Sequence, residues 1–214
     1  MDLSALLPII DETVSLDRLR RRMSASSGDA LTLGVSDGAK AAVIAALARD
    51  ASAPLLIITP KPQHAEALAE ELRAWLGSEH GERVHVFPER DALPFERLAP
   101  DPDDIALRLD VLERLHNQEA VVVVACAASI AQRTISTEEL QRASIELETV
   151  TRLDQHALLA SLIAGGYSIE PQVTAPGEAS RRGGIIDVWP PSEAQPLRVE
   201  LFGDEVESIR AFDP

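Results

Sequence analysis

A short segment of the chain, residues 34–41 (GVSDGAKA), has the layout of a phosphate-binding Walker A loop, whose pattern is G-x-x-x-x-G-K-[ST]. Gly34 and Lys40 fit this pattern, but Ala39 replaces the second glycine and Ala41 replaces the serine or threonine. The second glycine lets backbone N–H groups wrap the phosphates, and the hydroxyl group binds magnesium. Because Ala39 and Ala41 supply neither, we expect no productive ATP site. Weak residual phosphate binding is the alternative.

The sequence around this loop alternates between apolar runs and segments with apolar residues at helical spacing. The expected strands are residues 31–35, 54–59, 84–87 and 121–124, and the expected helices are residues 14–23, 38–49, 63–76 and 103–115. The strands are continuous apolar runs, which is typical of a parallel sheet covered by helices on both faces. Because the loop lies between an expected strand and an expected helix, the pattern predicts a P-loop-type α/β fold with a degenerate nucleotide site.

The pattern changes after about residue 136, where we place the boundary between a first domain, 1–136, and a second domain, 137–214. The second domain has an alternating segment at 145–150 and an expected helix at 154–164, with Asp154 as its N-cap and Gly165-Gly166 as its stop. Further strands are expected at residues 167–173, 184–189, 197–202 and 206–212. These features predict a small antiparallel α+β unit.

The expected strand at 197–202 carries unlike residues on its two faces. Arg198 and Glu200 share one face, and Phe202 falls on that same face because side chains alternate along a strand. An exposed aromatic residue beside arginines is typical of a protein–protein interface. The alternative is that a bulge or the strand end turns Phe202 inward. The pair Arg181-Arg182, taken alone, is more typical of a solvated turn.

Other residues that could carry chemistry do not form a catalytic or metal-binding pattern. The five histidines are scattered without ligand spacing, and the acidic group Asp204, Glu205 and Glu207 is expected to be a solvated turn. Cys126 is the single cysteine, and it follows an apolar strand as a buried, unreactive thiol would. One cysteine fits a reducing cytoplasm. We therefore expect no catalytic residues and no metal ligands.

Charge and composition disfavour nucleic acid and membranes as partners. The formal net charge of −15 repels DNA on average, although a local basic patch stays open, and aromatic residues for base stacking are only 3% of the chain. The longest apolar run, residues 120–128, is too short for a transmembrane helix. The N-terminal residues lack the basic region of a signal peptide. We expect a cytoplasmic protein with no membrane partner.

Three stretches carry the more specific motifs: residues 34–47, residues 87–102 with the helix that follows, and residues 176–190 with 198–214 (PGEASRRGGIIDVWP and RVELFGDEVESIRAFDP). In this order they resemble the N-terminal module of the bacterial transcription-repair coupling factors (Mfd), which itself resembles UvrB. UvrB proteins are the close alternative, but they have an intact Walker A loop and a tyrosine-rich hairpin. Ala39, Ala41 and the single tyrosine, Tyr167, favour the coupling factors.

The resemblance implies a fragment that binds a protein partner, has no cofactor and is not itself an enzyme. In this family the second domain recruits UvrA, the damage-recognition ATPase of nucleotide excision repair, and its contact residues match Arg182, Arg198 and Phe202. The full-length proteins add a domain that binds RNA polymerase and a double-stranded-DNA translocase motor, which alone uses ATP and Mg²⁺. An intramolecular contact with their C-terminal region masks the UvrA site. The alternative is an N-terminal fragment of a UvrB-like ATPase or helicase.

Overall fold

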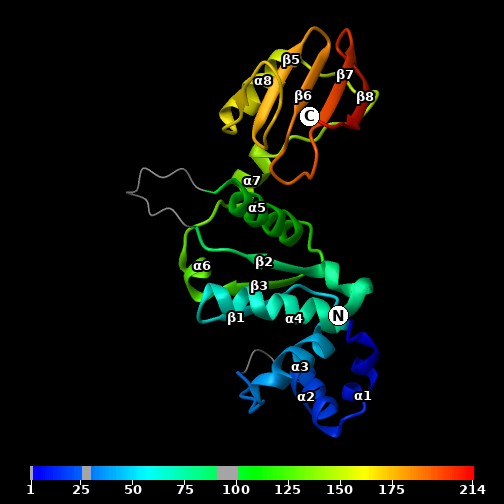
Figure 1. Ribbon diagram of the computed structural model, residues 1–214, viewed down its shortest axis with the longest axis vertical. Helices are drawn as coiled ribbons and strands as arrows, with labels where there is room; N and C mark the ends of the chain where they lie inside the picture. Colours follow the sequence, from blue (N-terminus) through cyan, green and yellow to red (C-terminus); the bar gives the residue numbers. More distant parts are fainter. Residues whose placement is uncertain (1, 26–29, 91–100) are drawn as a thin grey trace. The chain divides into compact units, whose positions relative to one another are not determined.

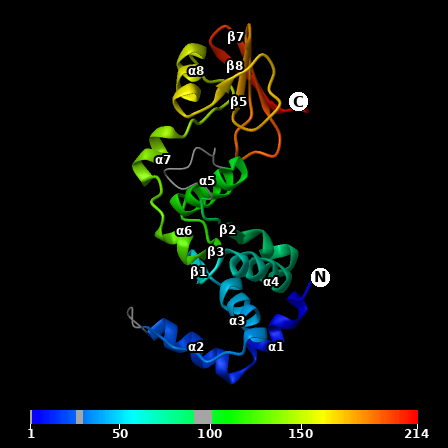
Figure 2. The same cartoon turned by 60° about the vertical axis from the view of Figure 1, so that its left-hand side comes forward.

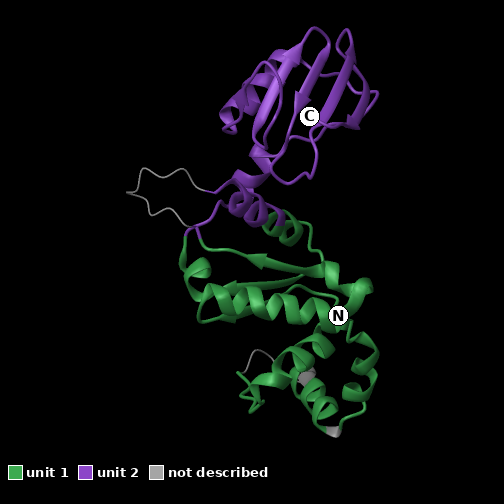
Figure 3. Cartoon of the chain, viewed as in Figure 1, with its two compact units in different colours: residues 1–89, 111–132 green, residues 90–110, 133–214 purple. Residues whose placement is uncertain are grey.

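The computed structural model describes residues 2–25, 30–90 and 101–214. Contacts in space divide the chain into two compact units, which are coloured separately in Figure 3. The first unit comprises residues 1–89 and 111–132, and the second unit comprises residues 90–110 and 133–214. The expected domain boundary near residue 136 stays a prediction, because this division also assigns residues 90–110 to the second unit.

The first unit is built on a parallel sheet of three strands in the order β1-β3-β2. β1 spans Leu55–Thr59, β2 spans Val84–Phe87 and β3 spans Val122–Cys126. Every residue of β3 is buried, as expected for the central strand of a sheet that is covered on both faces. The prediction of an α/β unit with a parallel sheet is therefore confirmed.

Helices pack on both faces of this sheet (Figure 1). A large core joins one face to α1 (Leu7–Asp11), α2 (Val14–Ala25), α3 (Asp37–Arg49) and α4 (Pro62–His80). On the other face, Phe87 and Val123 pack with Val111 of α5 (Pro102–His116). Short helices complete the unit: α6 (Ala127–Ala131) and the 3-10 turns Ser4–Leu6 and Gly81–Arg83.

The strand expected at residues 31–35 is wrong. The described residues 30–36 form no strand, and α3 begins directly afterwards at Asp37. Leu31 is half-buried and packs against the core, but Leu33 is 52% exposed. Exposure alone does not explain the difference, since Leu56 and Ile58 of β1 are equally exposed; the described sheet contains no strand that pairs with this run. A strand–loop–helix arrangement around residues 34–41 is accordingly not seen in the part of the chain that the structure describes.

The second unit contains a five-stranded sheet in the order β4-β5-β6-β7-β8. Its strands are β4 (Ser168–Ile169), β5 (Glu178–Arg182), β6 (Ile185–Val188), β7 (Leu197–Phe202) and β8 (Glu205–Ala211). β5 to β8 pair antiparallel, as predicted, but β4 runs parallel to β5, so the sheet is mixed and the predicted antiparallel unit is confirmed only in part. β5 was not expected, because its sequence EASRR has no apolar alternation.

One face of the mixed sheet is covered by α8 (Gln155–Ala164), as Figures 1 and 2 show from two directions. Leu158 and Leu162 of this helix pack against Ile186, Val199 and other apolar residues of the sheet. The predicted N-cap is confirmed, because the Asp154 carboxylate accepts hydrogen bonds from two backbone N–H groups of the first turn. The other face carries mainly polar side chains, with Ile185 and Phe202 among them.

Residues 137–150, which belong to the second unit, also differ from expectation. A helix, α7 (Thr137–Ala143), begins at a capping box in which Ser136 and Glu139 exchange hydrogen bonds. The strand expected at 145–150 is wrong: these residues are irregular and end in a turn. Leu147 packs against the core of the second unit, and its apolar neighbours at positions 145 and 150 are exposed. The alternation of apolar and polar residues at 145–150 therefore belongs to an irregular loop that contributes Leu147 to the core.

Candidate functional site

The β5–β6 hairpin brings Arg182 to one end of the mixed sheet. Arg182 pairs with Ile185 across a two-residue turn, Gly183-Gly184, and Gly183 has a φ of +62°. A positive φ at the first central position is the usual place of glycine in such hairpins. Gly184 lies against β7, since its carbonyl accepts a hydrogen bond of 2.8 Å from the backbone N–H of Leu201. A Cβ at Gly184 would lie 2.8 Å from the Leu201 carbonyl oxygen, so this position needs glycine.

The β7–β8 hairpin brings Phe202 to the same end. Phe202 pairs with Glu205 across a second two-residue turn that also begins with a glycine of positive φ, Gly203 at +68°. A bulge lies nearby, because the register shifts by one residue on β8, at Glu207. The bulge leaves the alternation of β7 intact: Leu201 is buried, and Phe202 is 83% exposed. The alternative in which Phe202 is turned inward is therefore wrong.

A buried carboxylate lies at the centre of the polar face. The register aligns Ser180, Asp187, Arg198 and Arg210 in one row across β5 to β8. The side chain of Asp187 is only 2% exposed. Its two oxygens accept hydrogen bonds from Nε and Nη2 of Arg198, at 2.7 and 2.8 Å. Arg182 reaches the same carboxylate from the end of β5, with its Nη2 atom 3.3 Å from Oδ2.

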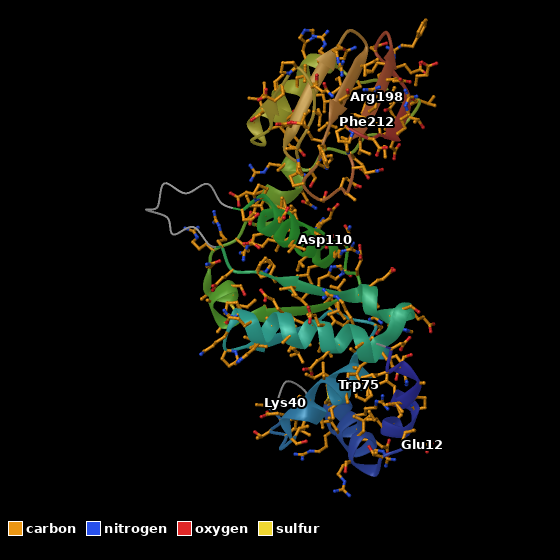
Figure 4. All side chains as sticks on the ribbon, viewed as in Figure 1. Glu12, Lys40, Trp75, Asp110, Arg198 and Phe212 are labelled. Atoms are coloured by element: carbon orange, nitrogen blue, oxygen red, sulfur yellow. The ribbon has the colours of Figure 1, made fainter. Side chains whose placement is uncertain are left out.

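The two arginines are held to different degrees. The guanidinium carbon of Arg198 lies 4.6 Å from the centre of the Phe212 ring, so one face of the cation is stacked while one edge is held by Asp187. Figure 4 labels Arg198 and Phe212 near each other in the second unit. The hydrogen bonds to Asp187 raise the pKa of the Arg198 guanidinium. The side chain of Arg182 is 58% exposed and makes the single long contact to the carboxylate. Arg198 is therefore a fixed cation, and Arg182 keeps donors for an external acceptor.

A second ion pair borders this cluster on β7 and β8. Glu200 accepts hydrogen bonds from Arg210 at 2.5 and 3.2 Å and from the Ser208 hydroxyl at 2.9 Å. The face thus combines three arginines with two paired carboxylates, in a chain whose net charge is −15. Such an arrangement can receive carboxylates of a protein partner around an exposed aromatic side chain.

The residues of the Walker A-like segment lie in the first unit and have other roles. Lys40, labelled in Figure 4, forms an ion pair of 2.6 Å with Asp37 in the first turn of α3. This hydrogen bond lowers the pKa of the Asp37 carboxyl. Gly34 is exposed and Ala39 is half-buried, whereas Ala41 is 1% exposed and belongs to the main core. The segment therefore presents its lysine to a carboxylate of its own helix.

Possible metal ligands and the single cysteine are the remaining groups that could carry chemistry. Among the residues with assigned positions, no group of three or more His, Cys, Asp and Glu side chains could hold a metal ion. Cys126 is buried, and its sulfur accepts a hydrogen bond of 3.4 Å from the backbone N–H of Ser129 as the cap of α6. Within the same ranges, none of the helices combines the length and apolarity that crossing a bilayer requires.

The structure thus brings Arg182 of β5 and Arg198 of β7 together on the Asp187 carboxylate. Phe202 lies further along β7, on the same face as Arg198. Arg198 and Phe202 are four residues apart, a distance of roughly 13 Å along a strand. Sequence reasoning missed Asp187 and Phe212, which hold Arg198 in place. The aspartate between apolar residues in IIDVW could have indicated a buried carboxylate at Asp187. Only the strand register shows that Arg198 is its partner.

Comparisons with known proteins give one match to part of the second unit and several matches to most of the chain. Residues 145–214 match the model of the family described as the UvrB interaction domain. The transcription-repair-coupling factor of Bacillus subtilis is 33% identical over 183 residues, which cover 86% of this chain and 15% of that protein. That of Mycobacterium bovis is 33% identical over 216 residues, covering 95% and 17%, and that of Escherichia coli is 27% identical over 198 residues, covering 92% and 17%.

The chain therefore spans 15–17% of the length of these relatives. The match to the relatives extends over most of the chain and includes both units, whereas the family model matches only residues 145–214, within the second unit. These findings confirm the resemblance predicted from the sequence. Over most of its length, the chain corresponds to the N-terminal, UvrB-like region of the transcription-repair-coupling factors.

Proposed function

We propose that the open face of the mixed sheet binds UvrA, and that the chain thereby recruits UvrA during transcription-repair coupling. Two findings support the proposal: the relatives carry the coupling-factor name, and the second unit matches the UvrB interaction domain. The relatives named above are coupling factors and not UvrB proteins, which favours this function over that of a UvrB-like ATPase.

One geometric observation carries the proposal. Arg182 and Arg198 converge on the buried carboxylate of Asp187, on the face that also presents the exposed ring of Phe202. A phenylalanine with 83% of its surface in water contributes little to the stability of the unit. Such a side chain is well suited to fill an apolar pocket of a partner, where it would bury most of its area.

The two arginines have different parts in this proposal. Arg198 is oriented before binding by two hydrogen bonds and the Phe212 ring, so little side-chain entropy is lost when the partner docks. Arg182 is more exposed and supplies donors that a partner carboxylate can take up in a bidentate pair. The matching surface on UvrA would therefore combine an apolar pocket with acidic residues at its rim.

We propose the activities of a whole coupling factor only for a full-length protein of this family. By the family resemblance, further domains contact RNA polymerase and move along double-stranded DNA with ATP and Mg²⁺, and a C-terminal region masks the UvrA site. UvrB, which resembles this module, would compete for an overlapping surface of UvrA. For the present chain we propose no ATP hydrolysis, because Ala41 is a core residue without a hydroxyl and Lys40 pairs with Asp37.

Titration of immobilised, purified UvrA with the chain and its variants tests the proposal. Phe202→Ala and Arg182→Ala should each weaken binding about thirtyfold, which corresponds to roughly 2 kcal/mol for a central anchor. Arg198→Lys keeps a charge at Asp187 but loses the planar fork, and it should weaken binding as well. Arg181→Ala is the matched control, because Arg181 contacts Gln155 at the start of α8, on the opposite face. Unchanged affinity of all three variants would contradict the proposal.

A further inference from the structure

One of the two non-glycine residues with positive φ in the described part of the chain lies beside the hairpin that carries Phe202; the other is Gln118. Val150 has a φ of +64°, in the left-handed region, where a β-branched residue is a clear exception. Its side chain is 78% exposed. Val150 and Phe202 are the two most exposed of the large hydrophobic residues that the structure describes. An apolar side chain in an unfavourable backbone conformation, with most of its surface in water, contributes nothing evident to the fold.

Hydrogen bonds and packing on both sides enforce this conformation. Val150 is the second central residue of the turn Glu148–Thr151, and the Thr151 hydroxyl donates to the Glu148 carbonyl at 2.6 Å. Leu147 before the turn and Leu153 after it pack into the core. A positive φ at this position of a turn is ordinarily taken by glycine or asparagine. The sequence therefore retains a valine where glycine would fit the backbone better.

The turn is attached to the edge of the sheet next to Phe202. The Val150 N–H donates to the Val206 carbonyl at 2.8 Å, and the Val206 N–H donates to the Thr151 carbonyl at 2.9 Å. Val206 pairs in turn with Leu201, the neighbour of Phe202. The backbone of Val150 thus lies two strand spacings, roughly 10 Å, from that of Leu201. This distance is within the footprint of one protein–protein interface.

We propose that Val150 is a second apolar contact residue of the UvrA-binding surface, an inference that rests on the proposed function. Strained backbone conformations persist where the surrounding structure enforces them, and they cluster at binding sites. Here the exposed valine would add an apolar contact at the edge of β8, and Phe202 and the two arginines would supply the centre. The partner would accordingly present a continuous apolar strip, with the carboxylates for Arg182 and Arg198 at one side.

Substitution of Val150 separates binding from stability. Val150→Gly removes the side chain and relieves the strained φ, so the melting temperature of the chain should stay equal or rise while the affinity for purified UvrA falls about tenfold. Val150→Asn also tolerates the positive φ and should lose affinity, whereas Val150→Ile should retain it. The control is Ile163→Ala, which removes a 57% exposed apolar side chain from α8 on the opposite face and should leave the affinity unchanged.

Two results would overturn the inference. Wild-type affinity of Val150→Gly would show that UvrA does not contact this side chain. A loss of affinity that accompanies a lower melting temperature would show that the valine acts only through the fold. Failure of the proposed function is distinguishable from both, since in that case the wild-type chain itself would not bind UvrA, and no contact residue for this partner would remain to assign.

Discussion

Removal of the Asp187 carboxylate should destabilise the second unit more than any other change on its polar face. Asp187 is 2% exposed and forms two hydrogen bonds with Arg198, whose side chain is 26% exposed. Removing one partner of a buried ion pair typically costs about 3–5 kcal/mol, because the other charge is left without compensation. Arg198 retains some access to water, so we expect Asp187→Ala to cost about 3 kcal/mol.

The neighbouring contact provides an internal comparison. The Arg182 side chain is 58% exposed and lies 3.3 Å from the same carboxylate, so water screens the pair. Arg182→Ala should therefore cost about 0.5 kcal/mol or less. Asp187→Asn keeps one acceptor oxygen but loses the charge, and its cost should lie between those of the other two variants.

Urea unfolding can follow the second unit alone. The chain has two tryptophans, Trp75 in the first unit and Trp189 beside β6 in the second. In a Trp75→Phe background the fluorescence reports on Trp189, and the midpoint gives the stability of its unit. A loss of about 3 kcal/mol corresponds to a fall of about 12–24 °C in melting temperature for a domain of this size. A cost below about 1 kcal/mol for Asp187→Ala, or an equal cost for Arg182→Ala, would refute the reasoning.

Three further predictions follow from the geometry. Hydrogen bonds from the N–H groups of Ala157 and His156 lower the pKa of the Asp154 carboxyl below its ordinary value of 3.8. The ionised carboxylate therefore stabilises the fold fully above pH 3.8. This stabilisation is lost as the pH falls through the lower pKa of the folded state. The urea midpoint of Asp154→Asn should accordingly fall less between pH 6 and pH 3 than that of the wild type, and parallel curves would contradict this. Gly184→Ala should lower the thermal stability of the second unit, because the new Cβ would lie 2.8 Å from the Leu201 carbonyl oxygen, and an unchanged melting curve would argue against the hairpin geometry. Calorimetry with millimolar Mg-ATP should give no binding isotherm, and a clear stoichiometric one would restore a nucleotide site.

The strands of the first unit could be predicted because each is a nearly unbroken apolar run, although only β3 is buried along its whole length. Residues 55–59, 84–87 and 122–126 are apolar throughout or nearly so, and each lies in the parallel sheet. The apolar run at 31–35 has a similar composition, but it forms no strand. Composition shows that a segment can be buried on both faces, yet whether a neighbouring strand is there to pair with it depends on the whole sheet.

The second unit was harder to predict because its pairings are decided across the sheet. β5 (EASRR) forms a strand because it pairs with β6. Its own residues show no alternation that would predict a strand. The alternation at 145–150 indicated a strand, but Leu147 alone is drawn into the core. The helix at 137–143 was missed, although Ser136 and Glu139 have the spacing of a capping box.

The candidate surface was predictable in part. The period of two places Arg198 and Phe202 on one face of β7, and the burial pattern of that strand agrees. Arg182 and Arg198 meet at Asp187 only because β5, β6 and β7 pair in one particular register. No local sequence pattern predicts that register. The assignment of these residues to UvrA binding came from family resemblance and stays a proposal.

The most direct test of the central claim is a hydroxyl-radical footprint of the chain with and without UvrA. Phe202 is 83% exposed, so its ring should be oxidised readily in the free chain. Saturating UvrA should reduce that oxidation several-fold, while Met23, 46% exposed on α2 of the first unit, should be oxidised at the same rate in both samples. Equal oxidation of Phe202 with and without bound UvrA would contradict the account.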